Sequence, residues 1–220
     1  MKKKIISFCL YGNLDFYCLG LIENIDLINE KYNDWTIYIY YANIPEKILN
    51  ILKNKKNTYL FECNHNGYNW EGMFWRFYPI EDKDIDIFIS RDADSRITDR
   101  EMIFVNEWLN SDKIFHIIRD HLGHRIEILG GTFGVKVKEF QKINNLKKLD
   151  YYIKLFYDRF SKDQDRQPDQ IFLQEYVWPL IENTNMAHIA GEELRYKTGD
   201  IITGFVPDFI GEPIEPKIKI

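Results

Sequence analysis

The chain has 220 residues and a mass of 26.5 kDa, and 45% of its residues are hydrophobic and 29% are charged. This length and composition fit one folded domain with a sizeable core, and they exclude a disordered chain. The formal net charge of -5 at pH 7 argues against a surface that neutralises the phosphates of a nucleic acid duplex. A local pocket for a single diphosphate remains compatible with that charge.

The cysteines and the N-terminal segment indicate the cellular compartment of the protein. Cys9, Cys18 and Cys63 are an odd number without metal-ligand spacing, so neither a disulfide framework nor a zinc site is indicated. The apolar run after the N-terminal lysines ends at Gly12 and Asn13 without a small-residue cleavage site, which favours a buried strand over a signal peptide. We expect a protein of the cytoplasm, or of the host cytoplasm if the source is viral, with no transmembrane segment and no nucleic acid partner.

Aromatic residues make up 15% of the chain. Their rings can stack on bases or sugars, or they can fill a bulky core. Because aromatic side chains contribute mainly through burial, we expect most of them in the core.

Strand-like and helix-like segments alternate along the chain. Apolar, β-branched or aromatic runs predict strands at residues 5–11, 35–41, 58–63, 85–90, 113–119 and 126–137. Helical spacing of apolar residues predicts helices at residues 16–32, 45–52, 70–78, 99–109, 137–160 and 169–181. This alternation predicts an α/β fold in one domain over residues 1–220: a mainly parallel sheet flanked by helices, with ligands beyond the carboxyl ends of the strands. The Gly- and Pro-containing tail at 192–220 is predicted to be loop-rich and able to wrap the sheet or cover a site.

Two carboxylates directly follow the predicted strand 85–90. Asp92 and Asp94 lie one residue apart where the chain leaves the sheet, so their like charges repel unless a cation joins them. Mg²⁺ or Mn²⁺ suits this pair, since these ions take one or two carboxylates together with phosphate oxygens. The alternative is that the pair only caps the next helix. Other Asp-x-Asp pairs, at 84–86 and 163–165, precede a strand or lie in a polar loop, so position favours Asp92 and Asp94.

Residues 88–96 (FISRDADSR) resemble the DxD segment of nucleotide-sugar glycosyltransferases with the GT-A fold. Four further segments resemble parts of glycogenin-like and bacterial lipopolysaccharide galactosyltransferases. Residues 73–79 resemble their Arg-bearing helix, and residues 128–134 resemble their glycine-containing acceptor-side strand. Residues 169–173 resemble their Asp-Gln helix start, and residues 187–191 resemble their late His-x-x-Gly metal segment. With residues 115–121 (FHIIRDH), the pattern also looks like a smaller microbial and viral group of glycosyltransferases. Arg91 before the pair, the short chain and the unmatched tail depart from the better-known families.

The resemblance implies a metal and a donor site. Asp92, Asp94 and His188 would hold Mn²⁺ or Mg²⁺, and the alternative for His188 is a core histidine. The nucleotide-binding residues would be Leu10, Tyr11, Gly12, Tyr17, Arg76, Asp92 and Ala93. In this set Gly12 would allow close backbone approach, a tyrosine would stack on the base, and Arg76 would reach the phosphates.

The resemblance also implies a reaction face. Asp169 is the first candidate for a catalytic or acceptor-orienting carboxylate and Asp120 the second, while Asp169 could instead belong to the first turn of a helix. The acceptor or sugar would contact His121, Gly130, Gly131 and Gln170.

The implied activity is metal-dependent transfer of a sugar from a nucleoside diphosphate sugar, with UDP favoured and GDP possible, to a hydroxyl acceptor on a glycan, lipid or protein. A nucleotidyltransferase that makes nucleotide sugars is an alternative, although residues 10–13 are not a Gly-rich phosphate loop. A sugar- or nucleotide-binding domain without activity is another. The donor sugar, the acceptor, the stereochemistry and the oligomeric state do not follow from the sequence.

Overall fold

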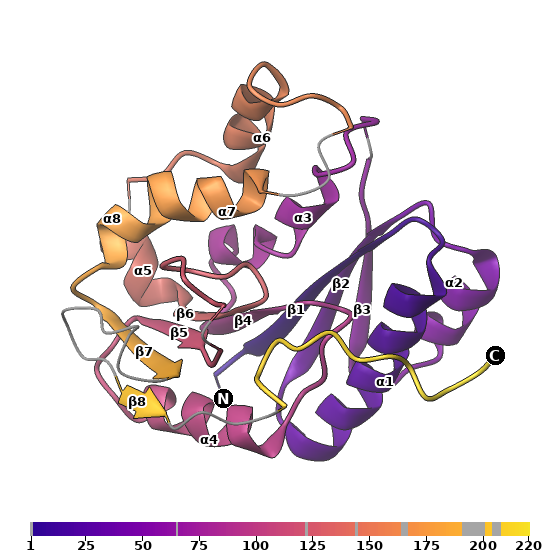
Figure 1. Cartoon of the computed structure of the whole chain (residues 1–220), viewed down its shortest axis with the longest axis horizontal. Coiled ribbons are helices and arrows are strands. Elements are labelled where there is room, and N and C mark those ends of the chain that lie inside the picture. The colour runs from indigo at the N-terminus through magenta and orange to yellow at the C-terminus, as the bar shows by residue number, and fades with distance from the viewer. Residues whose placement is uncertain are drawn as a thin grey trace.

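The computed structural model is built on one eight-stranded sheet with helices on both faces (Figure 1). It describes residues 2–64, 66–121, 123–143, 145–163, 167–190, 201–203 and 208–220. The strands are β1 (Lys4–Tyr11), β2 (Thr36–Ala42), β3 (Thr58–Glu62), β4 (Ile87–Arg91), β5 (Phe115–Arg119), β6 (Thr132–Lys136), β7 (Asn185–Ala190) and β8 (Ile201–Thr203).

The sheet has the order β3-β2-β1-β4-β6-β5-β7-β8. The pairs β1–β2, β1–β4, β2–β3, β5–β7 and β7–β8 are parallel, whereas β6 pairs antiparallel with both β4 and β5. The predicted mainly parallel α/β sheet is therefore confirmed. The carboxyl ends of β1 and β4 lie side by side, since Ser7 of β1 is in register with Ser90 of β4.

The helices divide between the two faces of the sheet. They are α1 (Asp15–Lys31), α2 (Glu46–Lys53), α3 (Gly72–Trp75), α4 (Asp99–Leu109), α5 (Val137–Ile143), α6 (Leu149–Tyr157), α7 (Pro168–Phe172) and α8 (Trp178–Ile181), with a 3₁₀ turn η1 (Tyr78–Glu81) and a π turn η2 (Leu173–Val177). One face is covered by α1, α2 and α4, and the other by α3 and α5–α8.

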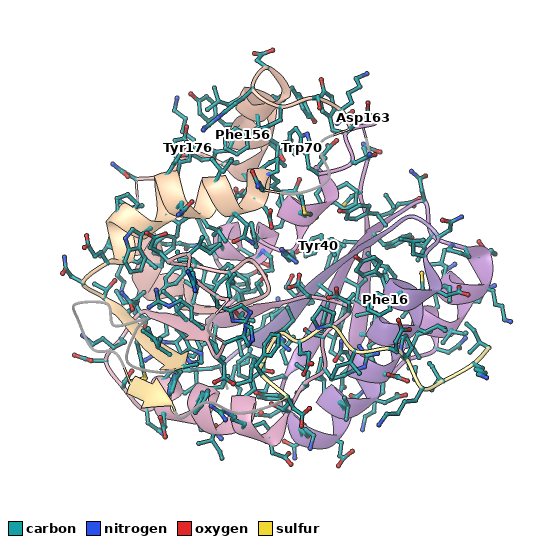
Figure 2. The ribbon with its side chains drawn as sticks, in the orientation of Figure 1. Phe16, Tyr40, Trp70, Phe156, Asp163 and Tyr176 are labelled. Atoms are coloured by element: carbon teal, nitrogen blue, oxygen red, sulfur yellow. The ribbon has the colours of Figure 1, made fainter. Side chains whose placement is uncertain are left out.

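Side chains along each strand point alternately to two hydrophobic cores, one on each face of the sheet. Ile6, Phe8 and Leu10 of β1 pack beneath α1 and α2, whereas Ile5 faces the opposite core, because successive side chains of a strand point to opposite faces. The opposite core is rich in aromatic rings, as the positions of Trp70, Phe156 and Tyr176 show in Figure 2. The expectation that most aromatic residues fill the core agrees with this burial.

Several predicted boundaries need correction. The predicted helix 137–160 contains two helices, α5 and α6, and residues 145–148 before α6 are not helical. The predicted strand 126–137 contains strand only from Thr132, and the predicted helix 70–78 is a short α3 followed by η1, which has Pro79 in its first turn. The strand β7 was not predicted, and β8 lies within the predicted loop-rich tail.

In the part of the chain that the structure describes, no helix combines the length and the apolar character that crossing a membrane requires.

Candidate functional site: a carboxylate pocket at the strand ends

A pocket of about 450 Å³ lies beyond the carboxyl ends of β1 and β4. We call it the carboxylate pocket. Its lining includes most of the residues predicted for donor and metal binding: Leu10, Tyr11, Tyr17, Arg76, Asp92, Ala93 and Asp94. Asp169 and Gln170 of the predicted reaction face line it as well. Cys9, Leu14, Met73, Gln167 and Pro213 complete the lining. Segments from both halves of the chain thus meet in one cavity, within the usual size range of small-molecule sites.

Asp92 and Asp94 enter this pocket from the turn that follows β4. They do not cap α4, because Thr98 is its N-cap and accepts a hydrogen bond from the Glu101 amide at 3.1 Å. Burial, and secondarily the negative charge of Asp92, raises the pKa of Asp94 above its ordinary value. The environment therefore disfavours two bare carboxylates and would favour a cation between them.

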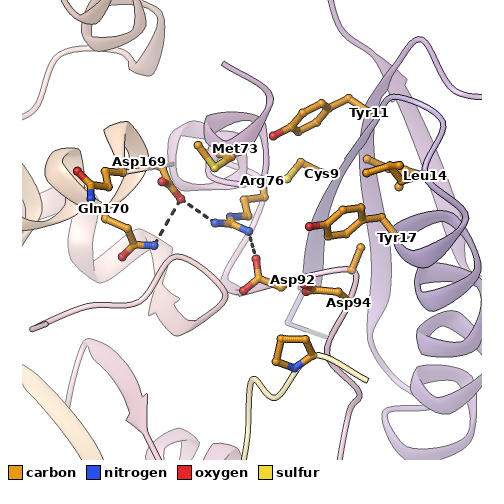
Figure 3. A pocket seen from close by; sticks show the side chains of 14 residues that line it. Cys9, Tyr11, Leu14, Tyr17, Met73, Arg76, Asp92, Asp94, Asp169 and Gln170 are labelled. Carbon is orange, nitrogen blue, oxygen red and sulfur yellow. Dashed lines mark hydrogen bonds and ion pairs between the residues drawn. The ribbon is translucent and has the colours of Figure 1, made fainter. Parts of the chain in front are cut away.

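Arg76 connects this turn to the opposite wall of the pocket. Its guanidinium donates to Asp92 through Nη1 and to Asp169 through Nη2, the latter over 2.8 Å (Figure 3). Burial opposes the positive charge, but the neighbouring carboxylates outweigh it and raise the pKa of Arg76. Its Nε is buried and makes no hydrogen bond within the described part of the chain. Arg76 therefore carries a fixed positive charge with one remaining buried donor.

Asp169 and Gln170 begin α7 on the far wall. Asp169 is buried, and desolvation raises its pKa, although the Arg76 charge opposes that shift. With its amide oxygen toward Gly130, the Gln170 side chain accepts from the Gly130 N–H and donates to the Ile128 carbonyl, both at 2.9 Å. The prediction that these two residues begin a helix is confirmed, and their side chains also line the pocket.

Gly130 and Gly131 pack directly against the charged groups. A Cβ at Gly131 would overlap the Asp92 carboxylate, and a Cβ at Gly130 would overlap Arg76 and lie 2.8 Å from Asp169 Oδ2. The two glycines therefore permit the close approach of this loop to the clamp formed by Asp92, Arg76 and Asp169. Neither is a lining residue of the pocket, so a direct contact with the acceptor stays a prediction.

Tyr11 and Tyr17 stand on the side of the pocket opposite Asp169 and Gln170 (Figure 3). The Tyr11 ring packs edge-on against Trp75, with the ring centroids 5.8 Å apart. Gly12 follows with φ of 77°, and a Cβ there would meet no atom within 4 Å. Gly12 thus meets the backbone requirement of the turn after β1, and its close approach to a nucleotide stays a prediction.

Some lining residues were not predicted, although two of them have a signal in the sequence. Cys9 precedes Tyr11 by two residues on β1, so both side chains point to the same face. Met73 precedes Arg76 by three residues, which is helical spacing. Pro213 has no comparable local signal, because it reaches the pocket from the C-terminal segment.

The structure does not bring His188 into the carboxylate pocket with Asp92 and Asp94. His188 lies on β7, and its Nδ1 is 3.0 Å from His116 Nε2 while its Nε2 is 2.9 Å from Glu107 Oε2. Its ring also stacks on Phe104 with centroids 4.1 Å apart. Both ring nitrogens therefore have protein partners, and the alternative of a core histidine describes it correctly. We call His116, His188 and Glu107 the histidine cluster.

Asp120 and His121 are also placed outside the carboxylate pocket. Asp120, just after β5, is buried, pairs with Arg100 at 2.7 Å and accepts from the Ile210 N–H at 3.3 Å. His121 stacks on Phe209 with centroids 4.3 Å apart, and its Nδ1 accepts from the Gly123 N–H. The structure therefore does not bring the second catalytic candidate to Asp92 and Asp94, and His121 anchors a loop.

A second cavity, of about 340 Å³, has a separate lining. Its described lining residues include the carboxylates of Glu62, Glu71 and Asp150 and one basic residue, Lys154. The carboxylate pocket has the same formal balance of three carboxylates and one basic side chain, but there the basic side chain, Arg76, is buried and bonded to two of the carboxylates.

Comparison of the sequence with protein-family models and with curated proteins finds no match. Solved structures do match. The galactosyltransferase LgtC in complex with donor and acceptor sugar analogues aligns with a TM-score of 0.53 at 12% identity, over 79% of this chain and 70% of that one. An active-site mutant of LgtC aligns with a TM-score of 0.52 at 12% identity, over 85% and 75%. The glycosyltransferase GlyE of Streptococcus pneumoniae TIGR4 aligns with a TM-score of 0.51 at 13% identity, over 85% of this chain but 45% of GlyE. At such identities the likeness concerns the fold, and the chain has a GT-A-like glycosyltransferase fold.

Proposed function

We propose that this protein is a metal-dependent glycosyltransferase that moves a sugar from a nucleoside diphosphate sugar, most favourably a UDP-sugar, to a hydroxyl acceptor. The observation that carries the proposal is the carboxylate pocket itself. Paired carboxylates, a buried arginine and a third carboxylate, which is buried, meet at the carboxyl ends of parallel strands, where open α/β sheets bind ligands.

The two walls of the pocket suggest how the donor lies. Tyr11 and Tyr17 offer rings for the base on one side, and Asp169 and Gln170 offer hydrogen-bonding groups for the sugar on the other. Between them Arg76 lines the pocket and offers its positive charge to the diphosphate. In this orientation the nucleotide spans the pocket from α1 to α7.

The side chains of the carboxylate pocket supply some, but not all, of the ligands that a divalent cation needs. Asp92 and Asp94 supply hard oxygen ligands, and the pKa of Asp94 is raised by burial and secondarily by the negative charge of Asp92, which a cation would offset. In the described ranges no three His, Cys, Asp or Glu side chains form a group able to hold a metal. Two carboxylates together with phosphate oxygens and water suit Mg²⁺ or Mn²⁺. Such an ion would stabilise the charge that develops on the departing nucleoside diphosphate.

The residues of the clamp then have distinct tasks. Arg76 binds the diphosphate and holds Asp92 in position, since it already donates to that carboxylate. Asp169 orients Arg76 and faces the transferred sugar, where it can contact or deprotonate the acceptor hydroxyl. Cys9 takes no nucleophilic role, because desolvation raises the pKa of its thiol to about 12 and keeps it protonated.

Titration calorimetry with UDP-, GDP-, CDP- and dTDP-sugars, each with and without Mn²⁺, tests the proposal. We expect binding of at least one nucleotide sugar that strengthens with Mn²⁺, and slow donor hydrolysis in the same solution. Absence of binding across the panel would contradict the proposal. Pyrophosphate release from a nucleoside triphosphate and a sugar phosphate would identify a nucleotidyltransferase instead, and binding without turnover would identify a binding domain.

A further inference from the structure

The turn that carries Asp92 and Asp94 is held from two sides by segments remote in the sequence. One side is α1, and the other is the C-terminal segment, of which we call residues 213–218 the C-terminal strap. Figure 1 shows this segment, drawn in yellow, passing along α1. Pro213 of the strap lines the carboxylate pocket.

The contacts from α1 are buried and specific. Asn24 donates through Nδ2 to the Ser95 carbonyl at 2.6 Å and to the Ala93 carbonyl at 3.3 Å, and its Oδ1 accepts from the Ile97 N–H at 3.2 Å. A Cβ at Gly20 would lie 2.5 Å from the Ala93 carbonyl oxygen. The helix is therefore in direct contact with the turn, and one buried amide holds its backbone.

The strap holds the turn from the other side. The Ile214 N–H donates to the Asp94 carbonyl at 2.8 Å, and Ser95 and Pro213 form an isolated antiparallel bridge. Further along, the Ile218 N–H donates to Glu23 Oε1 of α1 at 2.9 Å. The strap is thus attached both to the turn and to the helix that supports it.

Arg96 joins the three parts. Its Nε donates to Glu23 Oε2 at 2.8 Å, its Nη1 to the Asp94 carbonyl at 3.1 Å and its Nη2 to the Ile214 carbonyl at 3.1 Å. The side chain is buried, so these contacts are shielded from water. A planar guanidinium can make such contacts in three directions, whereas a lysine ammonium acts as a point charge on a flexible stem.

We infer that Arg96, supported by Glu23 and the C-terminal strap, is a positioning residue that sets the Asp94 carboxylate for cation binding. The inference rests on the proposed function, because it concerns the metal-dependent part of nucleotide binding. Arg96 is not among the residues that line the carboxylate pocket. It acts by fixing the Asp94 backbone between α1 and the strap. Loss of Arg96 therefore weakens the contribution of the cation to nucleotide affinity more than it weakens the contributions of Arg76 and the tyrosines.

The test compares Arg96→Lys with Arg159→Lys. The control changes an exposed arginine that pairs with Glu175 at 2.6 Å, away from the pocket. Calorimetry measures UDP affinity with and without Mn²⁺, and thermal unfolding measures stability. We expect Arg96→Lys to reduce the Mn²⁺-dependent gain in affinity about tenfold, about 1.4 kcal/mol, with Mn²⁺-free binding within about twofold of the wild type. The control should match the wild type in both affinities.

The other outcomes are separable. If Arg96→Lys lowers the unfolding temperature but keeps the full Mn²⁺-dependent gain, its role is only structural and the inference is overturned. If the wild type itself binds no nucleotide in either condition, the proposed function fails and the inference fails with it. Should Arg96→Lys not fold, Glu23→Gln gives the same readout. That variant weakens the link to the strap, and an unchanged Mn²⁺-dependent gain in it would overturn the inference.

Discussion

The carboxylate pocket and the histidine cluster contain similar kinds of side chain, but they differ in what remains available to a ligand. In the histidine cluster, His188 uses both ring nitrogens within the protein, on His116 and Glu107. In the carboxylate pocket, burial and the charge of Asp92 raise the pKa of Asp94, and Asp94 faces the cavity with Arg76 and Asp92. Residue type alone therefore does not distinguish a ligand site from a core, whereas the count of satisfied lone pairs and donors does.

The largest effect is expected for Asp94→Ala. Removal of this carboxylate leaves one side chain of the pair, so Mn²⁺-dependent nucleotide binding should fall by about 100-fold or more. Calorimetry with UDP, with and without Mn²⁺, measures the effect. Glu62→Ala, at the rim of the second cavity, is the matched loss of one acidic side chain and should bind as the wild type does. Wild-type metal dependence in Asp94→Ala would remove Asp94 from the site.

Gly131→Ala should come next, because its new Cβ would overlap the Asp92 carboxylate and force the clamp apart. We expect nucleotide affinity with Mn²⁺ to fall about 10- to 100-fold, which corresponds to about 1.4–2.7 kcal/mol. Gly67→Ala is the control, since a Cβ there meets nothing within 4 Å and only the positive φ of 84° is strained. Equal affinities in the two variants would mean that Asp92 can move without loss of function.

His188→Ala should lower the stability of the protein without lowering nucleotide binding, the opposite of the effect expected for the pocket variants. Loss of the buried ring leaves a cavity beside Phe104 and removes the partner of His116, so the free energy of unfolding should drop by about 2–4 kcal/mol. Nucleotide binding with Mn²⁺ should be retained below the unfolding transition. Urea denaturation and calorimetry measure the two quantities. A stable variant that had lost only its metal dependence would return His188 to the metal site.

A further effect concerns the dependence of stability on pH. Burial lowers the pKa of His116 and of His188, so in the folded state both stay neutral at a pH where the unfolded chain binds protons. Their contribution to stability is present above about pH 6.5, the unfolded value, and is lost as the pH falls below it. Between pH 7 and pH 5 we expect a loss of about 1–3 kcal/mol, measured by urea denaturation. The loss should be smaller in His188→Ala, and an identical pH dependence in that variant would contradict this account.

Local pattern was enough to locate part of the site. The apolar strand β4 followed at once by Asp92 and Asp94 places two carboxylates at a sheet edge, because a buried strand must end where polar residues begin. Asp169 and Gln170 after Pro168 likewise begin a helix, as the sequence indicated. These features depend on neighbouring residues, so a sequence contains the information for them.

The tertiary structure alone decided which groups meet. Arg76 joins Asp92 and Asp169 across 16 and 93 residues of chain, and Pro213 reaches the pocket from the C-terminal segment. The same kind of long-range pairing, β5 beside β7, turned His188 toward His116 rather than toward a metal. Periodicity and spacing determine the face on which a side chain lies, but its partner depends on strand order and chain path, which local sequence does not encode.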